Sequence, residues 1–281
     1  MKIGLTHSTI RGDEKLLMVA AAARGIDLVP LDVRTLVLSP QSWSESLDVI
    51  LQRCVSTTLG MHAISFFEAI GISVVNSSSV AQVCEDKFAT SLRLHKHKVP
   101  TIPFALAFSE IQAIEAIEQL GGFPVVIKPT LGSWGRLLAK INDRDALEAV
   151  LEQKQVLGSP AHGAFYIQKY VEKSGRDIRA TTVGHRVVCA IYRESTHWIT
   201  NTARGAEAKP CLVDRELRKI CTAASRAVGG GVLGIDVFET DTGYAVNEVN
   251  HTTEFKNVQR VTGVDVAGRI IEYCEEVAHH G

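Results

Sequence analysis

The first 76 residues alternate short apolar runs with amphipathic stretches. Four apolar runs resemble buried strands in length and composition, at 3–6, 28–33, 49–54 and 72–76. Between them, residues 13–24 and 59–70 repeat apolar positions at helical spacing and are each followed by glycine, which is typical of a helix end. This alternation predicts a small parallel α/β sheet. Ligands bind at the carboxyl ends of such strands, so Arg53 is a candidate anion contact or else part of a surface salt bridge.

A second unit follows a serine-rich turn. Ser79 and Gln82 fit a capping box, which predicts a helix running through Lys87 to about residue 97. Pro100 and Pro103 then end this helix. Further on, the pattern predicts strands and helices at 101–107, 110–120, 123–129, 137–141 and 143–153. Residues 130–136, rich in glycine and serine, join the strands at 123–129 and 137–141.

The last unit is predicted to contain two hairpins and two helices. The predicted elements are a strand at 164–172, a hairpin at 177–193, helices at 214–228 and 266–277, and a hairpin at 232–250. Residues 279–281 are expected to form a frayed tail. The glycines at 229–234 match GxGxxG, but they follow a helix and open a strand, the reverse of a dinucleotide fingerprint. We predict three units, at 1–78, 79–165 and 166–281.

The hairpin at 232–250 brings carboxylates together. Folding it about its polar turn places Asp236 opposite Glu248, and Asn250 shares a face with Glu248 because side chains alternate along a strand. Opposed side chains lie roughly 5 Å apart, and like charges there destabilise the pair unless they are neutralised. A divalent cation would do this, since Mg²⁺ prefers oxygen ligands. Alternatively, the acids face solvent or pair with lysine or arginine.

Lys128 lies within an otherwise apolar strand. A buried lysine is costly unless it meets an anion. The glycine- and serine-rich residues that follow, including Gly132 and Ser133, could close over a phosphate with backbone N–H groups and a hydroxyl. Most glycine-rich hairpin loops are only turns, so the glycine- and serine-rich segment indicates a phosphate site only when it is taken together with Lys128.

Composition narrows the class of protein. The 281 residues carry 30 basic and 31 acidic side chains, giving a net charge of −1, which does not favour nucleic-acid or membrane-surface binding. Six cysteines are scattered without a CxxC pair and are expected to be reduced and buried. No signal-peptide pattern opens the chain, and no apolar run reaches the roughly 20 residues of a membrane span. These features predict a cytoplasmic enzyme.

Taken in order along the chain, these features resemble the ATP-grasp ligases. The resemblance is closest to the RimK-like group and, within it, to the LysX family of lysine biosynthesis. It rests on the segments at 85–91, 126–129, 132–140, 166–173, 175–179, 197–205 and 247–257. It implies an α/β and α+β architecture, in which a small parallel α/β pre-ATP-grasp domain precedes the ATP-grasp fold.

The resemblance also implies roles for individual residues. Those implied to bind ATP are Lys87, Lys128, Gly132, Ser133, Trp134, Gly135, Arg136, Gln168, Lys169, Tyr170, Val171, Asp177 and Asn201. The implied ligands of two Mg²⁺ ions are Asp236, Glu248 and Asn250. The implied amino-acid site comprises Arg193, Thr202, Ala203, Glu254, Phe255, Lys256, Asn257 and Val258. The implied catalytic arginines are Arg179, Arg193 and Arg204, of which Arg179 or Arg204 would stabilise a tetrahedral intermediate.

The implied reaction joins a carboxylate to an amine. ATP phosphorylates the C-terminal glutamate of a small acidic, LysW-like amino-group carrier protein, and the α-amino group of 2-aminoadipate then displaces phosphate. In this family, Asn followed by Thr or Ser after Glu-Phe-Lys marks aminoadipate users, and Gly followed by Phe marks glutamate users. Asn257 keeps the aminoadipate pattern, whereas Val258 lacks the hydroxyl. The alternatives are a RimK-like glutamate ligase with another acceptor and a non-catalytic ATP-binding protein. A homo-oligomer is a further expectation.

Overall fold

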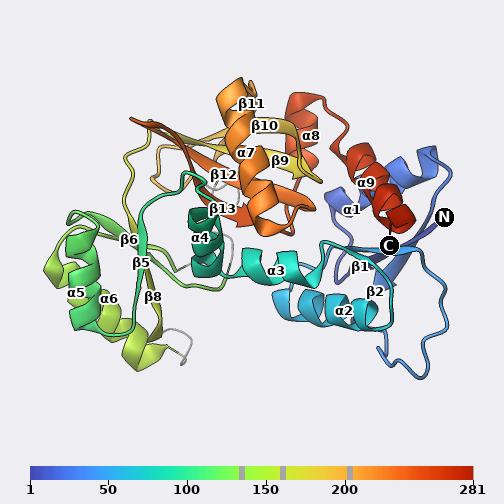
Figure 1. Ribbon diagram of the computed structural model, residues 1–281, viewed down its shortest axis with the longest axis horizontal. Helices are drawn as coiled ribbons and strands as arrows, with labels where there is room; N and C mark the ends of the chain where they lie inside the picture. The colour runs from blue at the N-terminus through green and yellow to red at the C-terminus, as the bar shows by residue number, and fades with distance from the viewer. Residues whose placement is uncertain (133–136, 159–162, 201–204, 281) are drawn as a thin grey trace.

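The computed structural model describes residues 1–132, 137–158, 163–200 and 205–280. Its N-terminal part is a parallel sheet ordered β2-β1-β3-β4. The strands are β1 (Lys2–His7), β2 (Asp27–Asp32), β3 (Val49–Gln52) and β4 (Val74–Val75). Helices α1 (Gly12–Ala23) and α2 (Thr57–Ala69) connect them, and this sheet lies at one end of the molecule (Figure 1). The predicted parallel α/β sheet is therefore confirmed.

An antiparallel sheet ordered β5-β8-β6-β7 lies at the opposite end (Figure 1). Its strands are β5 (Phe104–Ala107), β6 (Val125–Lys128), β7 (Ala139–Ile141) and β8 (Phe165–Lys169). Helices α5 (Glu110–Gln119) and α6 (Arg144–Leu157) bury Ile117 and Leu147 against Ile127 and Ile167. Asp143 caps α6, with its side chain accepting from Ala146 N.

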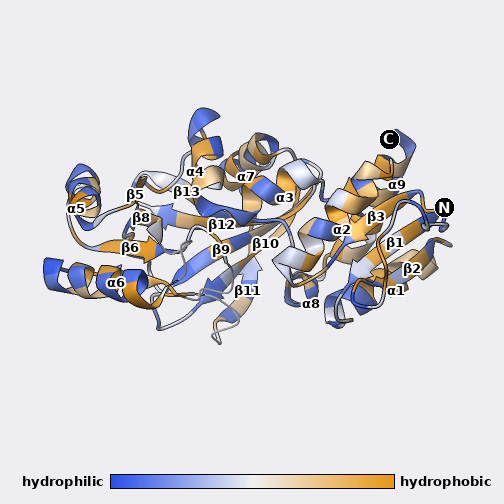
Figure 2. Cartoon of the chain, turned by 90° about the horizontal axis from the view of Figure 1, so that it is seen from below, coloured by the Kyte–Doolittle hydropathy of each residue, from blue (hydrophilic) through white to orange (hydrophobic). Residues whose placement is uncertain are grey.

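A larger antiparallel sheet, ordered β11-β10-β9-β12-β13, occupies the middle of the molecule. Its strands are β9 (Arg176–Val183), β10 (Arg186–Glu194), β11 (Glu207–Cys211), β12 (Val232–Thr240) and β13 (Gly243–Asn250). Helix α7 (Arg215–Val228) buries its apolar face against this sheet, whose strands carry both apolar and polar stretches in Figure 2. Gly229 closes α7 in the left-handed conformation, so the glycines do follow a helix and precede a strand, as predicted.

The C-terminal helices tie the central sheet to the N-terminal one. Helices α8 (Lys256–Thr262) and α9 (Val266–His280) follow the last strand. Ile270 and Ile271 of α9 share one apolar cluster with Ile3 of β1, Leu17 of α1 and Val183 of β9. Because this core includes residues from both ends of the chain, the N-terminal sheet and the last unit are packed into one body.

Several element predictions were wrong in detail. The helix expected from Ser79 to about residue 97 is two helices, α3 (Ser78–Glu85) and α4 (Lys87–Lys96), and its N-cap is Ser77. Asp86 lies between them in an extended conformation and caps α4 through Ala89 N. The break leaves the backbone N–H of Lys87 free to donate to Thr130 O, which ties the start of α4 to the glycine-rich segment.

Other differences come from tertiary packing. Strand β11 and helix α8 were not predicted, because neither carries a strong local pattern. Helix α9 continues to His280, so the expected frayed tail is helical through that residue. All six cysteines are buried and free, as expected. Among the described helices, none has the length and apolar character to cross a membrane.

Candidate functional site

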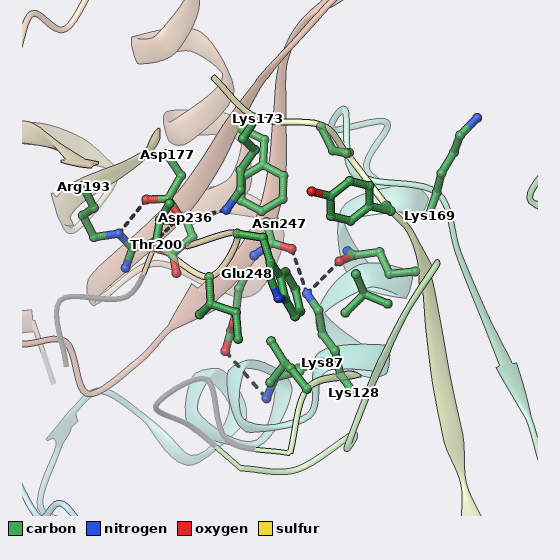
Figure 3. Close-up of a pocket in the computed structure, with 18 of the residues that line it drawn as sticks. Lys87, Lys128, Lys169, Lys173, Asp177, Arg193, Thr200, Asp236, Asn247 and Glu248 are labelled. Carbon is green, nitrogen blue, oxygen red and sulfur yellow. Dashed lines mark hydrogen bonds and ion pairs between the residues drawn. The ribbon is translucent and has the colours of Figure 1, made fainter. Parts of the chain in front are cut away.

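Two clefts lie on the central sheet. The first, the inter-sheet cleft, has a volume of about 90 Å³ and lies between the central sheet and the β5–β8 sheet. It is lined by Lys87, Lys128, Gln168, Tyr170, Lys173, Asp177, Arg193, Asp236 and Glu248, among others (Figure 3). The second, the N-terminal cleft, has a volume of about 320 Å³ and lies between the central sheet and the N-terminal unit. It is lined by Arg11, Asp13, Arg179, Glu254, Lys256, Asn257 and Val258, among others.

The two clefts meet at three residues. Gly132, Arg193 and Glu248 line both clefts. Arg193 is on β10 and Glu248 on β13, whereas Gly132 comes from the β6–β7 connection. The junction therefore combines a cation, a carboxylate and a glycine of the predicted phosphate-covering segment.

The hairpin has the predicted pairing, with one irregularity. Asp236 faces Glu248, as predicted, and Gly234 faces Asn250. A β-bulge after Asp236 pairs Val237 with Val246, so Asn247 is the extra residue on β13. Asn247 Oδ1 accepts a hydrogen bond from Lys128 Nζ at 3.0 Å. The bulge thus places the amide oxygen of Asn247 against the ammonium of Lys128, a contact that simple alternation along the strand does not predict.

Lys128 is buried at the end of β6. Its Nζ donates to Gln168 Oε1 at 2.7 Å as well as to Asn247, so two neutral amide oxygens hold it instead of an anion. The pKa of Lys128 is lowered to about 8, chiefly by burial; the carboxylate of Glu248 opposes this shift, and the charges of Lys87 and Lys173 add to it. A phosphate entering this cleft would supply the anion that the buried ammonium group lacks.

Lys87 lies across the same cleft. Its Nζ is 3.7 Å from Glu248 Oε1 and donates to Gly132 O. Lys173 is a third cation, with Nζ 3.0 Å from Thr200 Oγ1 and above the ring of Phe238. Burial lowers the pKa of Lys173. Three ammonium groups therefore converge on one narrow cleft.

The carboxylate of Asp236 is neutralised by two arginines. Arg179 forms two hydrogen bonds with it, and Arg193 Nη2 is 3.1 Å from Oδ1. Burial would raise the pKa of Asp236, but the two guanidinium groups outweigh burial and lower it. Pairing with basic residues, one of the alternatives left open by the sequence, is thus present at Asp236, and the predicted contact with Mg²⁺ stays a prediction.

Arg193 is anchored by a second carboxylate. Its Nε and Nη2 both donate to Asp177, each at 2.7 Å, and all three of these side chains, Arg193, Asp177 and Asp236, are almost fully buried. Thr200 also donates to Asp177. Asp177 lines the inter-sheet cleft, but both of its oxygens already hold the guanidinium of Arg193, and its predicted contact with a ribose stays a prediction.

The remaining predicted residues are distributed as follows. Gln168, Lys169, Tyr170 and Val171 form one wall of the inter-sheet cleft, although Figure 3 shows the Lys169 side chain pointing out of it. Phe255 does not line either cleft, because its side chain is fully buried in the core. The predicted residues Ser133, Trp134, Gly135, Arg136, Asn201, Thr202, Ala203 and Arg204 lie outside the described residues.

Arg53 was predicted either to contact an anion or to form a salt bridge at the surface. It forms a salt bridge, but that salt bridge is buried. Arg53 is 2% exposed, and its Nε is 3.2 Å from Glu14 Oε1. Four further residues of the site, Arg11, Asp13, Lys173 and Asn247, were not predicted from the sequence. Lys173 could have been found from its place at the end of an apolar strand, whereas the others depend on tertiary packing or on the bulge.

Asp236, Glu248 and Asn250 form a set of oxygen donors. In the part of the chain that the structure describes, no group of three or more His, Cys, Asp or Glu side chains is placed to hold a metal ion. Two carboxylates and an amide oxygen nevertheless suit a hard cation that takes its remaining ligands from phosphate oxygens. The donor set therefore fits Mg²⁺ bound together with a phosphate, and does not form a protein-only cage.

Comparison with known proteins accounts for both parts of the chain. Residues 3–83 match the LysX preATP-grasp domain and residues 84–274 match the RimK-like ATP-grasp domain. The chain is 36% identical to the alpha-aminoadipate–LysW ligase LysX of Sulfurisphaera tokodaii, over 98% of this chain and 99% of that protein. It is 32% identical to the glutamate–LysW ligase ArgX of the same organism, over 98% and 99%.

A solved structure shows the same architecture. The RimK domain ATP-grasp protein of Sphaerobacter thermophilus superposes on 98% of this chain with a TM-score of 0.81, at 26% identity and with 99% of that chain covered. The parallel N-terminal sheet followed by two antiparallel sheets is thus common to both proteins. Because the two domain matches together span residues 3–274, the chain belongs to the RimK-like ATP-grasp family and begins with the pre-ATP-grasp domain of LysX proteins.

Proposed function

We propose that the protein is an ATP-dependent ligase that joins 2-aminoadipate to the C-terminal glutamate of a small acidic LysW-type carrier protein. The observation that carries the proposal is the meeting of the two clefts at Gly132, Arg193 and Glu248. A cleft with three lysines suits the phosphates of ATP, and the N-terminal cleft offers Arg11, Arg179 and Lys256 to carboxylate groups. Similarity to ligases named for LysW supports the carrier as the partner.

The proposed reaction has two chemical steps. First, a carboxylate oxygen of the carrier attacks the γ-phosphorus of ATP and ADP leaves, which gives an acyl phosphate. Second, the unprotonated α-amino group of the amino acid attacks the acyl carbon and phosphate leaves, which gives an amide and releases one proton from nitrogen. Neither step needs a protein nucleophile. The residues that line the clefts bind, align and neutralise charge.

Each group has a defined part in this proposal. Lys87 and Lys128 bind the phosphates, and Arg193 stabilises the negative charge that develops at the junction. Arg179 lines the N-terminal cleft and holds Asp236 in place. Mg²⁺, held by Asp236, Glu248 and Asn250, would neutralise phosphate charge when bound.

The choice of 2-aminoadipate rests on the segment after Glu254. Asn257 and Val258 both line the N-terminal cleft, which is where an amino acid would have to bind to reach the junction. Asn257 fits the aminoadipate pattern of the LysX family. Val258 is 3% exposed and is close to threonine in shape, so the wall of the cleft is retained while one hydroxyl is lost.

An ADP-release assay tests this proposal. The purified protein is mixed with ATP, Mg²⁺, a LysW-type carrier and either 2-aminoadipate or glutamate. We expect ADP release that depends on both the carrier and the amino acid, with a higher kcat/KM for 2-aminoadipate. Faster release with glutamate would overturn the choice of amino acid, and no release with either amino acid would overturn the proposed function.

Lys128 makes a pH-dependent contribution to the proposed nucleotide binding. Its pKa is about 8 in the free protein, and a bound phosphate would raise it by favouring the protonated form. Below pH 8 the ammonium is already charged and the affinity is independent of this group. Above pH 8 binding must take up a proton, so we expect the affinity for ATP to fall by up to about tenfold for each pH unit.

Isothermal titration calorimetry with ATP between pH 7.5 and 9.5, in two buffers with different ionisation enthalpies, measures both the affinity and the proton uptake. In the Lys128→Met variant the affinity at pH 7.5 should be lower and nearly flat with pH. A wild-type affinity that stays flat up to pH 9.5, with no proton uptake, together with an unchanged affinity of the Lys128→Met variant at pH 7.5, would show that Lys128 does not bind the phosphates.

A further inference from the structure

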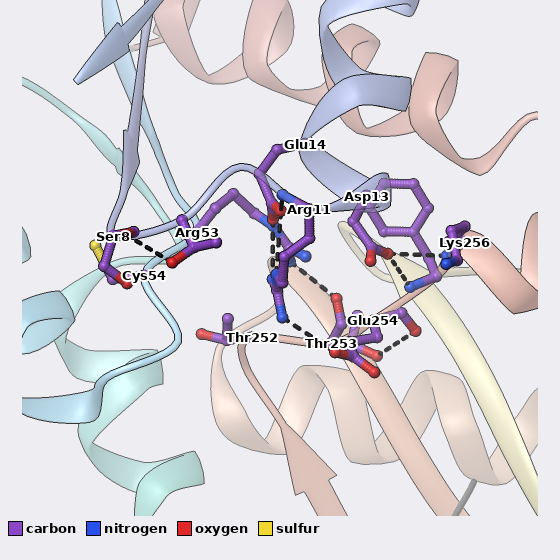
Figure 4. A network of polar contacts seen from close by, with 12 residues as sticks. Ser8, Arg11, Asp13, Glu14, Arg53, Cys54, Thr252, Thr253, Glu254 and Lys256 are labelled. Atoms are coloured by element: carbon purple, nitrogen blue, oxygen red, sulfur yellow. Dashed lines mark hydrogen bonds and ion pairs between the residues drawn. The ribbon is translucent and has the colours of Figure 1, made fainter. Parts of the chain in front are cut away.

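Charged side chains of the N-terminal unit hold a segment of which Glu254 and Lys256 line the N-terminal cleft (Figure 4). We name residues 253–256 the cleft segment. Arg53 Nη1 donates to the carbonyl of Thr253 at 2.9 Å. Arg11 Nη1 donates to Glu254 Oε1 at 3.0 Å. Asp13 Oδ1 accepts from the backbone N–H groups of Phe255 and Lys256, at 2.6 and 2.8 Å. Every residue of this segment is therefore bound by a side chain more than 190 positions away.

Glu14 links the two arginines of this cluster. It accepts from Arg11 Nη2 at 2.9 Å and from Arg53 Nε at 3.2 Å, and its side chain is fully buried. Burial would raise the pKa of Glu14, but the hydrogen bonds and charges of Arg11 and Arg53 outweigh burial and lower it. The guanidinium of Arg53 also lies 5.6 Å from the ring centre of Phe255. Buried groups with this many partners have little freedom to move.

Asp13 differs from the two arginines, because it binds the backbone at the start of α8. The residue before this helix, Phe255, has no polar side-chain atom, so it cannot cap the helix itself. Asp13 provides the missing acceptor from the first turn of α1, and it is 4% exposed. Asn257 and Val258 come directly after the two N–H groups that it binds. A shift of the helix start would therefore move both residues in the wall of the cleft.

The neighbouring Gly12 allows the two helices to approach closely. A Cβ atom at this position would lie 2.4 Å from Cδ of Lys256. The side chain of Lys256 thus lies directly over the backbone of the residue before Asp13. The starts of α1 and α8 are therefore in contact through Gly12 and the side chain of Lys256.

We propose that Asp13 is a positioning residue for the amino-acid site, which fixes the start of α8 so that Asn257 and Val258 present the wall that selects the amino acid. This inference rests on the proposed function, and it adds that selectivity depends on the N-terminal unit. Asp13 lines the N-terminal cleft and does not line the inter-sheet cleft. Its loss should therefore act on the amino acid and leave the affinity for ATP unchanged.

Steady-state kinetics of three proteins test this proposal. In the wild type, Asp13→Ala and Asp13→Asn, the amino acid that the wild type prefers and ATP are varied in turn. We expect Asp13→Ala to raise KM for the amino acid at least tenfold, with KM for ATP changed less than twofold. Asp13→Asn keeps an oxygen that can accept both N–H groups, so it should recover most of the wild-type KM. Equal changes in both KM values, or no rescue by asparagine, would overturn the proposal.

A second measurement does not depend on turnover. Amide hydrogen exchange of a peptide covering 255–260 should accelerate at least tenfold in Asp13→Ala. The matched control is Asp265→Ala, which removes a similar side-chain acceptor for Gly268 N in α9, outside both clefts, and should leave that peptide unchanged. If Asp13→Ala does not fold, Asp13→Glu keeps the buried charge and displaces its oxygens, and it should show the same changes to a smaller extent.

The two measurements separate the two proposals. A wild type without activity would overturn the proposed function, while faster exchange in Asp13→Ala would still support the positioning role. Unchanged exchange at 255–260 in the folded Asp13 variants would overturn the positioning role, even where the wild type is an active ligase.

Discussion

Replacing Glu248 with glutamine is expected to lower kcat for ADP formation by about 10³-fold while the protein stays folded. Glu248 lines both clefts, faces Asp236 across the hairpin and lies 3.7 Å from Lys87 Nζ. Glutamine keeps the size of the side chain but removes the charge that would help to hold a cation beside the phosphates. The change should therefore act on the chemical step and on the dependence on Mg²⁺ more than on stability.

The matched control for this substitution is Glu239→Gln. Glu239 lies on β12 of the same hairpin, pairs with Arg176 at 2.8 Å and does not line either cleft. We expect it to keep nearly the wild-type rate of ADP formation. Nearly normal ADP formation by Glu248→Gln, at any concentration of Mg²⁺, would contradict the proposed metal site.

The substitution Arg193→Met is expected to lower the free energy of unfolding by about 3–5 kcal/mol. Arg193 neutralises Asp177 and Asp236, and all three side chains are buried. Methionine fills a similar volume but leaves Asp177 without its ion-pair partner, and Arg179 remains as the only described cation bound to Asp236. Urea denaturation at pH 7 measures this change.

This loss should depend on pH in a defined direction. The arginines lower the pKa of Asp236 in the folded protein, so their stabilising effect is complete above the unfolded-state pKa of about 3.9 and is lost as the pH falls through the folded-state value. The difference between wild type and Arg193→Met should therefore shrink below about pH 4.

Arg176→Met provides the comparison on the adjacent strand. Arg176 pairs with Glu239 near the surface, and an exposed ion pair contributes less than about 1 kcal/mol. A similarly small effect of Arg193→Met at pH 7 would show that the buried ion pairs do not hold the junction together.

Strong local patterns predicted most of the fold. The parallel N-terminal sheet follows from apolar runs that alternate with helices, and the pairing of Asp236 with Glu248 follows from the period of two along a strand. The boundary between α3 and α4 could not be predicted, because Asp86 fits a helix as well as a cap in sequence alone. The backbone N–H of Lys87, which the break leaves free, binds Thr130 O, and this tertiary contact has no signal in the local sequence.

The site was predictable to the extent that chemistry appears in a single segment. Lys128 stands out within an apolar strand, and the carboxylates stand out within a hairpin. Two residues that shape the clefts could not be predicted in this way. Asn247 reaches Lys128 only because of the bulge, and Asp13 reaches Phe255 across 242 positions of sequence. Both depend on how separate elements pack, for which a single sequence carries no local signal.

Intact-mass spectrometry of the carrier protein tests the central claim most directly. A LysW-type carrier is incubated with the protein, ATP, Mg²⁺ and 2-aminoadipate, and its mass is measured before and after. We expect the carrier to gain the mass of one 2-aminoadipate less one water, at its C-terminal glutamate, and we expect omission of ATP to prevent this gain. An unchanged carrier mass, with 2-aminoadipate and equally with glutamate, would show that the protein is not a ligase of this carrier.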